Sequence, residues 1–267
     1  MPKLANARRV LAALPRPWQM ELADAHLEAV AKGEGAASVF RVVGPGDADR
    51  YLKVAKGRAA KALRDEIERT AWLGECGVRV PRVLRAHATA RQAAVILGAM
   101  PGLPPQACGR PTGEVVAGIA RTFAALHALS AEACPFDETI EVRLARARAD
   151  IRRGAIDPGR FDPRNRNTTP KHLYERLAAA RPVSEDVVVV HGDATFDNIL
   201  IDEDGAVGLI DCGNAGRADR YVDLWLIAAE IEEHFGSKWR KPFLRAYGLK
   251  SWDAGKARYF SDLYELF

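Results

Sequence analysis

The most constraining feature of this chain is a run of four valines, Val187 to Val190, that leads directly into His191-Gly192-Asp193. An apolar run of this length predicts a strand that is buried on both faces. The ends of such strands are places where a rigid scaffold holds reactive side chains, so Asp193 becomes a candidate. His191 is expected to orient its neighbours or fill the core. Asn198 follows Asp193 by five residues.

A second pattern begins at Asn198. Asp204-Gly205 is a preferred two-residue hairpin turn, and it separates two strand candidates, 198–201 and 206–210. A turn centred there pairs residues whose numbers sum to 409, which places Asn198 opposite Asp211. Opposed residues have Cβ atoms about 4.5–5.5 Å apart. An amide oxygen and a carboxylate suit Mg²⁺, so Asn198 and Asp211 are predicted magnesium ligands.

The first third of the chain has the pattern of a small sheet with one helix. Glycine and proline turns separate short strand candidates, and apolar residues recur four apart before Gly77. Strands are expected at 26–31, 38–43, 50–55, 81–84 and 93–97, and the helix at 61–75. The apolar run Val10–Leu14 is too short for a signal peptide or a membrane span and is interpreted as a surface helix turn.

The pattern changes at Gly98-Ala99-Met100-Pro101-Gly102, which is interpreted as a hinge. Helical patterns follow at 115–129, 141–153, 171–180, 223–234, 241–247 and 254–267. We therefore predict an α+β, two-lobed fold with an interlobe cleft, and the order of the polar residues along the chain makes this fold protein-kinase-like. A nucleotide-binding β lobe would cover 1–97, the hinge 98–102, and a helical lobe 103–267 with the catalytic loop, the metal site and the acceptor site.

The order of the polar residues matches the kinase template. Asp193 takes the place of the catalytic-loop aspartate, where it would accept or orient the proton of an acceptor hydroxyl. Asp211 is followed by Cys212-Gly213 and stands where kinases have their second metal-binding aspartate. Lys53 lies on a predicted strand and Glu66 on the predicted helix of the β lobe, as in the pair that positions the nucleotide phosphates. Each residue alone has an ordinary structural interpretation, but the ordered set indicates a phosphotransferase.

Composition limits the alternatives. The 267 residues are 48% hydrophobic, and 39 basic residues are nearly matched by 35 acidic ones, so we predict no nucleic-acid partner. Eight arginines between 143 and 166 are interpreted as a solvated helix face and loop. Four widely spaced cysteines without a CxxC pair indicate reduced thiols. We expect a cytoplasmic monomer or homodimer with no membrane partner.

The segments HGDATFDNILID and GLIDCGNAGRADRYVDLW resemble the nucleotide and metal motifs of the aminoglycoside 3′-phosphotransferases, the kanamycin and neomycin kinases. The resemblance extends to YLK around Lys53, the hinge LGAMPG, the segment 134–137 and the C-terminal LYELF, and so covers the chain from about Gly33 onward. It implies phosphate transfer from ATP, with GTP as an alternative donor and Mg²⁺ as cofactor.

The resemblance also implies how a nucleotide is bound. Tyr51 would stack on the adenine, and the backbone at Gly98 and Met100 would hydrogen-bond to its edge. A loop that begins at Gly33-Glu34-Gly35 and ends at Ser38 would cover the phosphates.

For the acceptor, the resemblance implies acidic groups in the helical lobe that bind the amines of an aminoglycoside. Glu233, Glu265 and the terminal carboxylate of Phe267 stand at matching positions, and Asp162 lies in the segment that corresponds to the acidic substrate loop of the family. Such a set suits a polycationic acceptor.

The chain departs from the family pattern at several positions. Tyr264 stands where the family usually has an aspartate, and Asn214 and Ala229 stand where it commonly has arginine. In the segment 161–166 Asp162 is the only acidic residue, and arginines there would repel a polycation. These departures concern the acceptor rather than phosphate transfer.

Other functions remain open at this point. A kinase of another small hydroxyl compound, such as a sugar-, choline- or homoserine-like acceptor, uses the same catalytic set. A nucleotide-binding module without turnover would be expected to lack one of its members. A protein kinase is disfavoured because few residues separate Asp211 from the helix that starts near Tyr221, and a P-loop NTPase is excluded because no GxxxxGK[ST] motif occurs.

Overall fold

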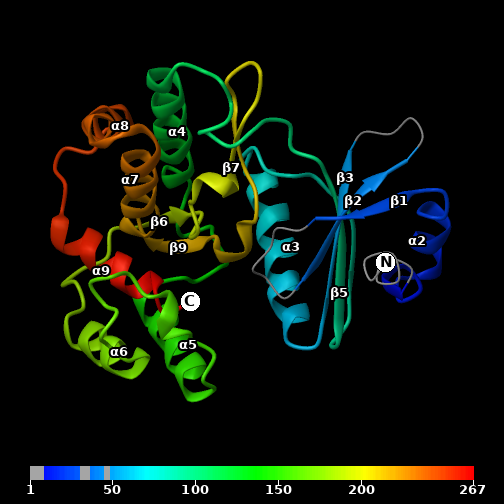
Figure 1. Cartoon of the computed structure of the whole chain (residues 1–267), viewed down its shortest axis with the longest axis horizontal. Helices are drawn as coiled ribbons and strands as arrows, with labels where there is room; N and C mark the ends of the chain where they lie inside the picture. The colour runs from blue at the N-terminus through cyan, green and yellow to red at the C-terminus, as the bar shows by residue number, and fades with distance from the viewer. Residues whose placement is uncertain (1–8, 31–36, 45–48) are drawn as a thin grey trace. The chain divides into compact units, whose positions relative to one another are not determined.

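The computed structural model describes residues 9–30, 37–44 and 49–267 and divides the chain into two units (Figure 1). The first unit comprises Met1–Pro101 with Gly208–Gly213, and the second comprises Gly102–Val207 with Asn214–Phe267. The first unit therefore includes a short segment from the second half of the chain. The division of roles among residues 1–97, 98–102 and 103–267 stays a prediction.

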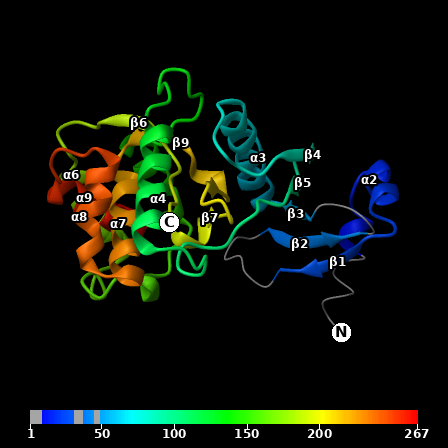
Figure 2. The same cartoon turned by 90° about the horizontal axis from the view of Figure 1, so that it is seen from above.

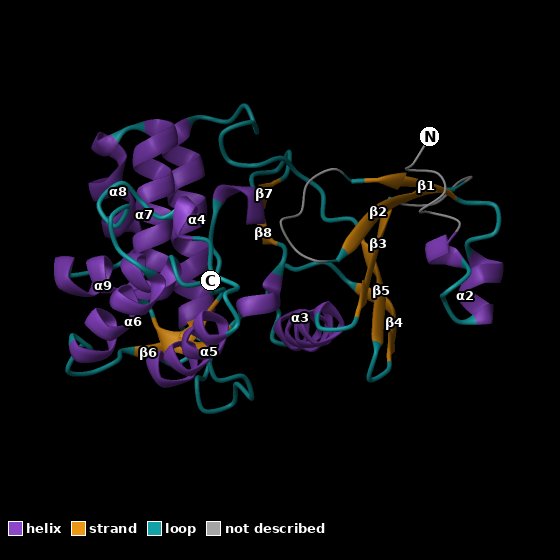
Figure 3. Cartoon of the chain, turned by 60° about the horizontal axis from the view of Figure 1, so that its bottom comes forward, coloured by secondary structure: helices purple, strands orange, loops and turns teal. Residues whose placement is uncertain are grey.

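An antiparallel five-stranded sheet in the order β1-β2-β3-β5-β4 forms the centre of the first unit (Figure 3). Its strands are β1 (His26–Ala29), β2 (Ser38–Val43), β3 (Arg50–Lys56), β4 (Val83–Ala88) and β5 (Gln92–Gly98). Apolar residues such as Phe40 and Val42 alternate with partly exposed ones along β2, as expected for a strand on a pleated surface.

Two helices, α2 (Arg16–Glu21) and α3 (Ala59–Glu75), lie on opposite faces of this sheet (Figure 3). On β3, Val54 packs into a cluster with Trp18 of α2, whereas Ala55 packs with Leu63 of α3. Because side chains alternate between the two faces of a strand, Lys53 shares the face of Ala55. The alternation therefore turns Lys53 toward α3.

The predicted helix turn at Val10–Leu14 is present, but its placement on the surface is wrong for Val10 and Leu14. Val10 and Leu14 are 8% and 4% exposed and pack in the same cluster as Trp18. The sheet face that lies away from α3 needs an apolar cover, and the four-residue spacing of Val10 and Leu14 supplies part of it.

The second unit is mainly helical (Figures 1 and 2). Its helices are α4 (Thr112–His127), α5 (Ile140–Arg152), α6 (Pro170–Ala179), α7 (Tyr221–Phe235), α8 (Arg240–Tyr247) and α9 (Ala254–Tyr264). α4 packs beside α8, and α7 beside α9. Local signals set the starts of two helices: Thr169 and Asp253 accept hydrogen bonds from the first turns of α6 and α9. No helix in the described part of the chain is long and apolar enough to cross a membrane.

Short strands and turns complete the second unit. β6 (Val187–Val190) pairs in antiparallel fashion with β9 (Gly216–Asp219). β7 (Ile199–Ile201) forms a two-stranded sheet with β8 (Val207–Leu209). The division of the chain into units falls within the sequence of β8. The predicted strand is confirmed, and Val188, Val189 and Val190 are at most 6% exposed, whereas Val187 at its start is 39% exposed. The sequence analysis did not predict β9, because Gly216-Arg217-Ala218-Asp219 has little strand propensity of its own.

Candidate active site

In the first unit, Lys53 is held by two carboxylates. Its Nζ donates to Glu66 Oε1 on α3 at 2.6 Å and also to Asp211. The side chains of Lys53 and Glu66 are only 12% and 18% exposed. Burial lowers the pKa of the Lys53 ammonium, but the two carboxylates outweigh burial and raise it to about 12. Lys53 is therefore a permanent cation at neutral pH, as phosphate binding requires.

Asp211 has an unusual backbone. Its φ of 57° makes it the one non-glycine residue with positive φ among the residues that the structure describes. Such conformations cost free energy and are concentrated at functional sites. The next residues are fastened to α3, because Arg69 Nη1 donates to the Gly213 carbonyl at 2.7 Å. The Asp211 carboxylate, 51% exposed, is thereby presented beside Lys53.

The other predicted nucleotide residues lie on the same sheet. Ser38 begins β2, and Tyr51 lies on β3 between its neighbours on β2 and β5. Gly98 ends β5, and its N–H already donates to the Arg82 carbonyl at 2.9 Å, so its own carbonyl is the group that would meet an adenine. The predicted glycine loop at 33–35 lies outside the described residues.

The hinge residue Met100 packs over Gly208. A Cβ at Gly208 would lie 2.8 Å from the Met100 sulfur, so a larger residue there would require the Met100 side chain to move. Met100 thus covers the segment that leads to Asp211, within the first unit.

In the second unit, the loop after β6 is tightly constrained. Gly192 has a φ of +86°, and a Cβ on it would lie 2.1 Å from the Asn214 carbonyl oxygen. The backbone N–H groups of His191 and Gly192 donate to the two oxygens of Asp223, at 2.7 and 2.8 Å. His191 is fully buried and its Nδ1 accepts from the Asp193 N–H at 3.3 Å, in agreement with the orienting role expected for it.

Two side chains hold the carboxylate of Asp193. Asn198 Nδ2 donates to Asp193 Oδ2 at 3.0 Å, and the Tyr264 hydroxyl donates to Asp193 Oδ1 at 2.7 Å. Asn198 Nδ2 also donates to the Asp193 carbonyl, at 2.9 Å. Both hydrogen bonds that Asn198 makes to Asp193 use the nitrogen of the Asn198 amide. The oxygen of that amide is therefore the end that would meet a cation.

Asp223 is the buried anchor of this loop. It is completely buried, and His127 Nε2 lies 3.1 Å from its Oδ2. Burial raises the pKa of Asp223, but its interaction with His127 and the hydrogen bond from the His191 backbone N–H outweigh burial and hold the pKa below its ordinary value. A carboxylate that stays ionised in the core can accept both backbone N–H groups of the loop.

The two-residue hairpin predicted at Asp204-Gly205 is wrong in detail. Asp202 N–H donates to the Ala206 carbonyl at 3.1 Å, so three residues lie between the paired positions. Gly205 has a φ of +82°, as in three-residue hairpins that end in a left-handed residue. The Asp202 side chain accepts from Ala206 N–H at 2.8 Å and stabilises the longer turn.

This turn removes the register argument for a metal site. β7 begins after Asn198 and β8 ends before Asp211, so neither residue occupies a paired strand position. Asn198 ends a 3-10 turn instead. Their assignment as magnesium ligands stays a prediction that depends on the kinase-like order of the residues. No cluster of three or more His, Cys, Asp or Glu side chains suited to a metal occurs in the described part of the chain.

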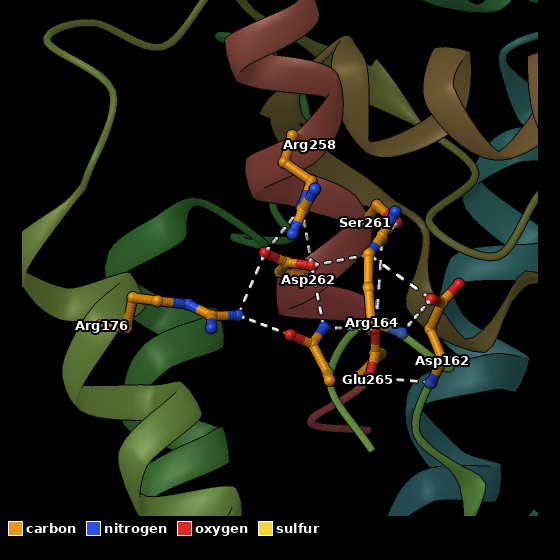
Figure 4. A network of polar contacts seen from close by, with 8 residues as sticks. Asp162, Arg164, Arg176, Arg258, Ser261, Asp262 and Glu265 are labelled. Carbon is orange, nitrogen blue, oxygen red and sulfur yellow. Dashed lines mark hydrogen bonds and ion pairs between the residues drawn. The ribbon is translucent and has the colours of Figure 1, made fainter. Parts of the chain in front are cut away.

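The predicted acceptor residues fall into two groups. Asp162 and Glu265 lie together, because Asp162 N–H donates to Glu265 Oε2 at 3.1 Å (Figure 4). Glu233 is exposed on the last turn of α7, near Glu230. The Phe267 ring lies 5.8 Å from the guanidinium carbons of both Arg143 and Arg146. Roles for these residues in acceptor binding stay predictions.

The interpretation of the arginine-rich stretch as a solvated face is also wrong in part. Arg143 is 5% exposed and its Nε donates to the Glu138 carbonyl, while Arg146 donates to the fully buried Glu138 carboxylate at 2.7 Å. Arg164 belongs to the network in Figure 4. Glu138 lies within eight residues of Arg143 and Arg146, whereas the Asp262 partner of Arg164 is distant in sequence, and a charge pattern alone does not reveal that either carboxylate is buried.

Several positioning residues were not predicted as such. Tyr264 was noted only as a departure from a family pattern, and Asp223 only as part of a helix start. Glu230 accepts from the Phe196 N–H at 2.8 Å and so holds the segment between Asp193 and Asn198. The signal for Glu230 and Asp223 was their seven-residue spacing on α7, which places both on one helix face.

Comparison with known proteins now decides the family. A model described as the phosphotransferase enzyme family matches residues 7–260. The chain belongs to this phosphotransferase family. The resemblance predicted from its motifs is thereby confirmed, and the chain is an enzyme of the phosphotransferase class.

Curated relatives of this phosphotransferase cover most of its length. It is 32% identical to an aminoglycoside 3′-phosphotransferase of Streptomyces fradiae, over 90% of this chain and 94% of the relative. It is 34% identical to a streptomycin 3″-kinase of Streptomyces griseus, over 88% and 90%.

Solved structures show the fold. An aminoglycoside 3′-phosphotransferase of type VIII has a TM-score of 0.85 and 33% identity and covers 98% of both chains. The aminoglycoside phosphotransferase APH(3″)-Id of Streptomyces rimosus, in complex with ADP and streptomycin, has a TM-score of 0.78 and 29% identity and covers 93% of this chain and 95% of that one. The predicted α+β, two-lobed, kinase-like fold is confirmed.

Proposed function

We propose that this phosphotransferase transfers the γ-phosphate of ATP to the 3′-hydroxyl of an aminoglycoside, which would confer antibiotic resistance. The observation that carries the proposal is the similarity, over nearly the whole chain, to aminoglycoside 3′-phosphotransferases. The arrangement of Asp193, with its carboxylate held by Asn198 and Tyr264, supports the same chemistry.

Each catalytic residue has a role in this proposal. Lys53, fixed by Glu66, would bind the nucleotide phosphates as a permanent cation. Asp193 would orient the acceptor hydroxyl and take its proton while the hydroxyl oxygen bonds to the γ-phosphorus. The bond from that phosphorus to the oxygen that bridges it to the β-phosphate breaks, and ADP leaves.

Magnesium fits the residues that are present. Asp211 offers a half-exposed carboxylate and Asn198 an amide oxygen, which is the oxygen donor set that Mg²⁺ prefers when nucleotide phosphates and water complete its shell. When bound, the ion would neutralise phosphate charge. The nucleotide would lie along the sheet, with Tyr51 against the base and the backbone of Gly98 and Met100 at its edge.

Streptomycin phosphorylation at a 3″-hydroxyl is a second candidate. It is favoured by the 34% identity to the streptomycin 3″-kinase of Streptomyces griseus. The two candidates share the donor and the catalytic residues, and they differ only in the acceptor.

A coupled ADP-release assay tests both candidates. Kanamycin, neomycin, streptomycin and tobramycin, which lacks a 3′-hydroxyl, would be compared as acceptors, with Asp193→Asn as the inactive control. We expect turnover of kanamycin and neomycin but not of tobramycin. Turnover of streptomycin alone would select the second candidate, and turnover of none would redirect the search to sugar-, choline- or homoserine-like acceptors.

A further inference from the structure

The segment after the 3-10 turn at 158–160 is tied to α9 by a dense polar network (Figure 4). Asn165, 1% exposed, lies at its centre and donates to Asp262 Oδ1 at 2.9 Å and to Glu265 Oε1 at 2.8 Å. Arg164 Nε lies 3.2 Å from Asp262 Oδ1, and its Nη2 lies 4.0 Å from Glu265 Oε1 and donates to Ser261. The carboxylates of Asp262 on α9 and of Glu265, which directly follows α9, are thus engaged by groups of this chain.

The network is connected through the chain to the proposed catalytic base. Tyr264, the residue before Glu265, donates its hydroxyl to Asp193 at 2.7 Å. The end of α9 is therefore fixed at the carboxylate that would receive the acceptor hydroxyl. Glu265 is also the residue that the family resemblance assigns to acceptor amines.

Charge in the network is balanced internally. Its carboxylates are Asp162, Asp262 and Glu265, and its guanidiniums are Arg164, Arg176 and Arg258. The side chains of Asp262 and Glu265 are only 8% and 10% exposed, whereas Asp162 is 45% exposed and the side chains of Arg164, Arg176 and Arg258 are 33%, 47% and 55% exposed. A ligand that approaches from solvent would therefore meet guanidinium groups before it meets the carboxylates of Asp262 and Glu265.

Arg164 differs from the other two arginines in the number of carboxylates that it contacts. Arg176 and Arg258 contact Asp262, but Arg164 contacts Asp162, Asp262 and Glu265. An acceptor ammonium seeking Glu265 or Asp162 would have to displace this guanidinium or accept its repulsion.

We propose that Arg164 is a specificity-determining residue, whose guanidinium occupies the place of an acceptor ammonium so that the site disfavours acceptors with many positive charges. The inference rests on the function proposed above and orders its acceptors: among aminoglycosides, those with fewer ammonium groups near the loop would be favoured. Neomycin, which has more amino groups than kanamycin, would be disfavoured most strongly.

Arg164→Gln tests the proposal, because it removes the charge and keeps a hydrogen-bond donor. Isothermal titration calorimetry on the full chain would give the Kd for neomycin and kanamycin, and the ADP-release assay the KM for ATP. We expect Arg164→Gln to bind neomycin about tenfold more tightly, which is ~1.4 kcal/mol, with the KM for ATP within about twofold of wild type.

Two matched variants separate this effect from a general change of charge. Arg166 is exposed on the same loop, and Arg166→Gln should leave the Kd for neomycin within about twofold. Arg164→Lys keeps the charge and should behave like wild type. An equal gain in Arg166→Gln, or a gain in Arg164→Lys, would overturn the proposal.

A purely structural role predicts the opposite result. If Arg164 only fastened the loop to α9, its loss would lower the Tm and weaken acceptor binding, and unchanged or weaker neomycin binding by Arg164→Gln overturns the proposal. Should that variant fail to fold, Ser261→Ala removes an acceptor of Arg164 without changing any charge and should tighten neomycin binding about threefold. No tightening there would likewise overturn the proposal.

The binding measurement also keeps the two proposals apart. Wild-type protein that phosphorylates no aminoglycoside would contradict the proposed function. The ratio of neomycin affinities between wild type and Arg164→Gln would still decide the role of Arg164, and absence of binding by both would count against it.

Discussion

Asp193 receives hydrogen bonds from residues of quite different origin. Asn198 lies on its own loop, whereas Tyr264 comes from the last helix of the chain. A carboxylate held at both oxygens has a fixed orientation. A general base must lie within hydrogen-bond reach of the proton it takes, so its orientation is the first requirement and its pKa the second. The hydrogen bond from the Tyr264 hydroxyl also orders the end of α9. There the centroid of the Tyr264 ring lies 5.5 Å from that of the Trp225 ring.

Tyr264→Phe should therefore lower kcat about tenfold, or ~1.4 kcal/mol, because a hydrogen bond to a charged group is lost while the ring contact is kept. The KM for ATP should stay within about twofold. Steady-state kinetics with the best acceptor measures both. A rise in kcat would mean that the hydroxyl instead obstructs the base.

Asp211→Ala should weaken Mg²⁺-dependent ATP binding by more than about tenfold, since the variant loses a metal ligand and a partner of Lys53. Titration calorimetry with and without Mg²⁺ measures the effect. Asp204→Ala, which removes an exposed carboxylate from the hairpin turn, is the control and should bind ATP like wild type. Equal affinities for all three proteins would refute the assignment of Asp211.

At the scale of elements, the loop between β6 and β7 is held in place by residues of other elements, chiefly of α7. Asp223 of α7 accepts two of its N–H groups, Glu230 accepts a third, and Gly192 fits against the Asn214 carbonyl. A buried strand with a helix-anchored loop is a rigid support for a catalytic side chain.

Gly192→Ala should lower the free energy of unfolding by about 3 kcal/mol, because the new methyl group meets a backbone carbonyl in a left-handed conformation. Gly77→Ala is a matched control, since Gly77 has a similar φ of +82° but open space around it. It should cost only about 1 kcal/mol. Urea denaturation gives both values, and equal losses would show that the carbonyl contact contributes nothing.

We expect Asp223 to make the free energy of unfolding depend on pH. Its pKa in the folded protein lies below that of an unfolded aspartate, about 3.9, so its contribution is present above that value and is lost as the pH falls through the folded pKa. The free energy of unfolding should therefore decrease on acidification below about pH 5.

Asp223→Asn provides the comparison. It should be less stable at pH 7 by about 3 kcal/mol, because two backbone N–H groups lose a charged acceptor. It should also show a shallower decrease between pH 5 and pH 3 in denaturation experiments. Parallel curves for the two proteins would exclude Asp223 as a source of the acid sensitivity.

At the scale of the whole molecule, the net charge of +4 bears on the prediction that this chain has no nucleic-acid partner. Several of the arginines that cluster in sequence form ion pairs with Glu138, Asp262 and other carboxylates of the second unit. We predict no measurable binding of a DNA duplex at 200 mM salt and only weak binding at 50 mM, by fluorescence anisotropy. Tight binding with a steep salt dependence would contradict this prediction.

The fold was largely predictable because its main elements carry local signals. The valine run, the period of the helices and the glycine and proline turns all act over a few residues, and the observed bounds of β2, β6 and α3 follow from them. β4 was placed too early, at 81–84 instead of Val83–Ala88, because Pro81 marks a turn rather than a strand start.

The sequence by itself determined the family, the fold class and the order Lys53, Glu66, Asp193, Asn198 and Asp211, since these depend on residue type and spacing. Tertiary structure alone decided which groups surround them. Tyr264 meets Asp193 across 71 residues, and Arg164 lies 3.2 Å from an Asp262 oxygen after a comparable separation. Such contacts have no periodic trace in the sequence, because they arise only when buried carboxylates must find partners in the packed chain.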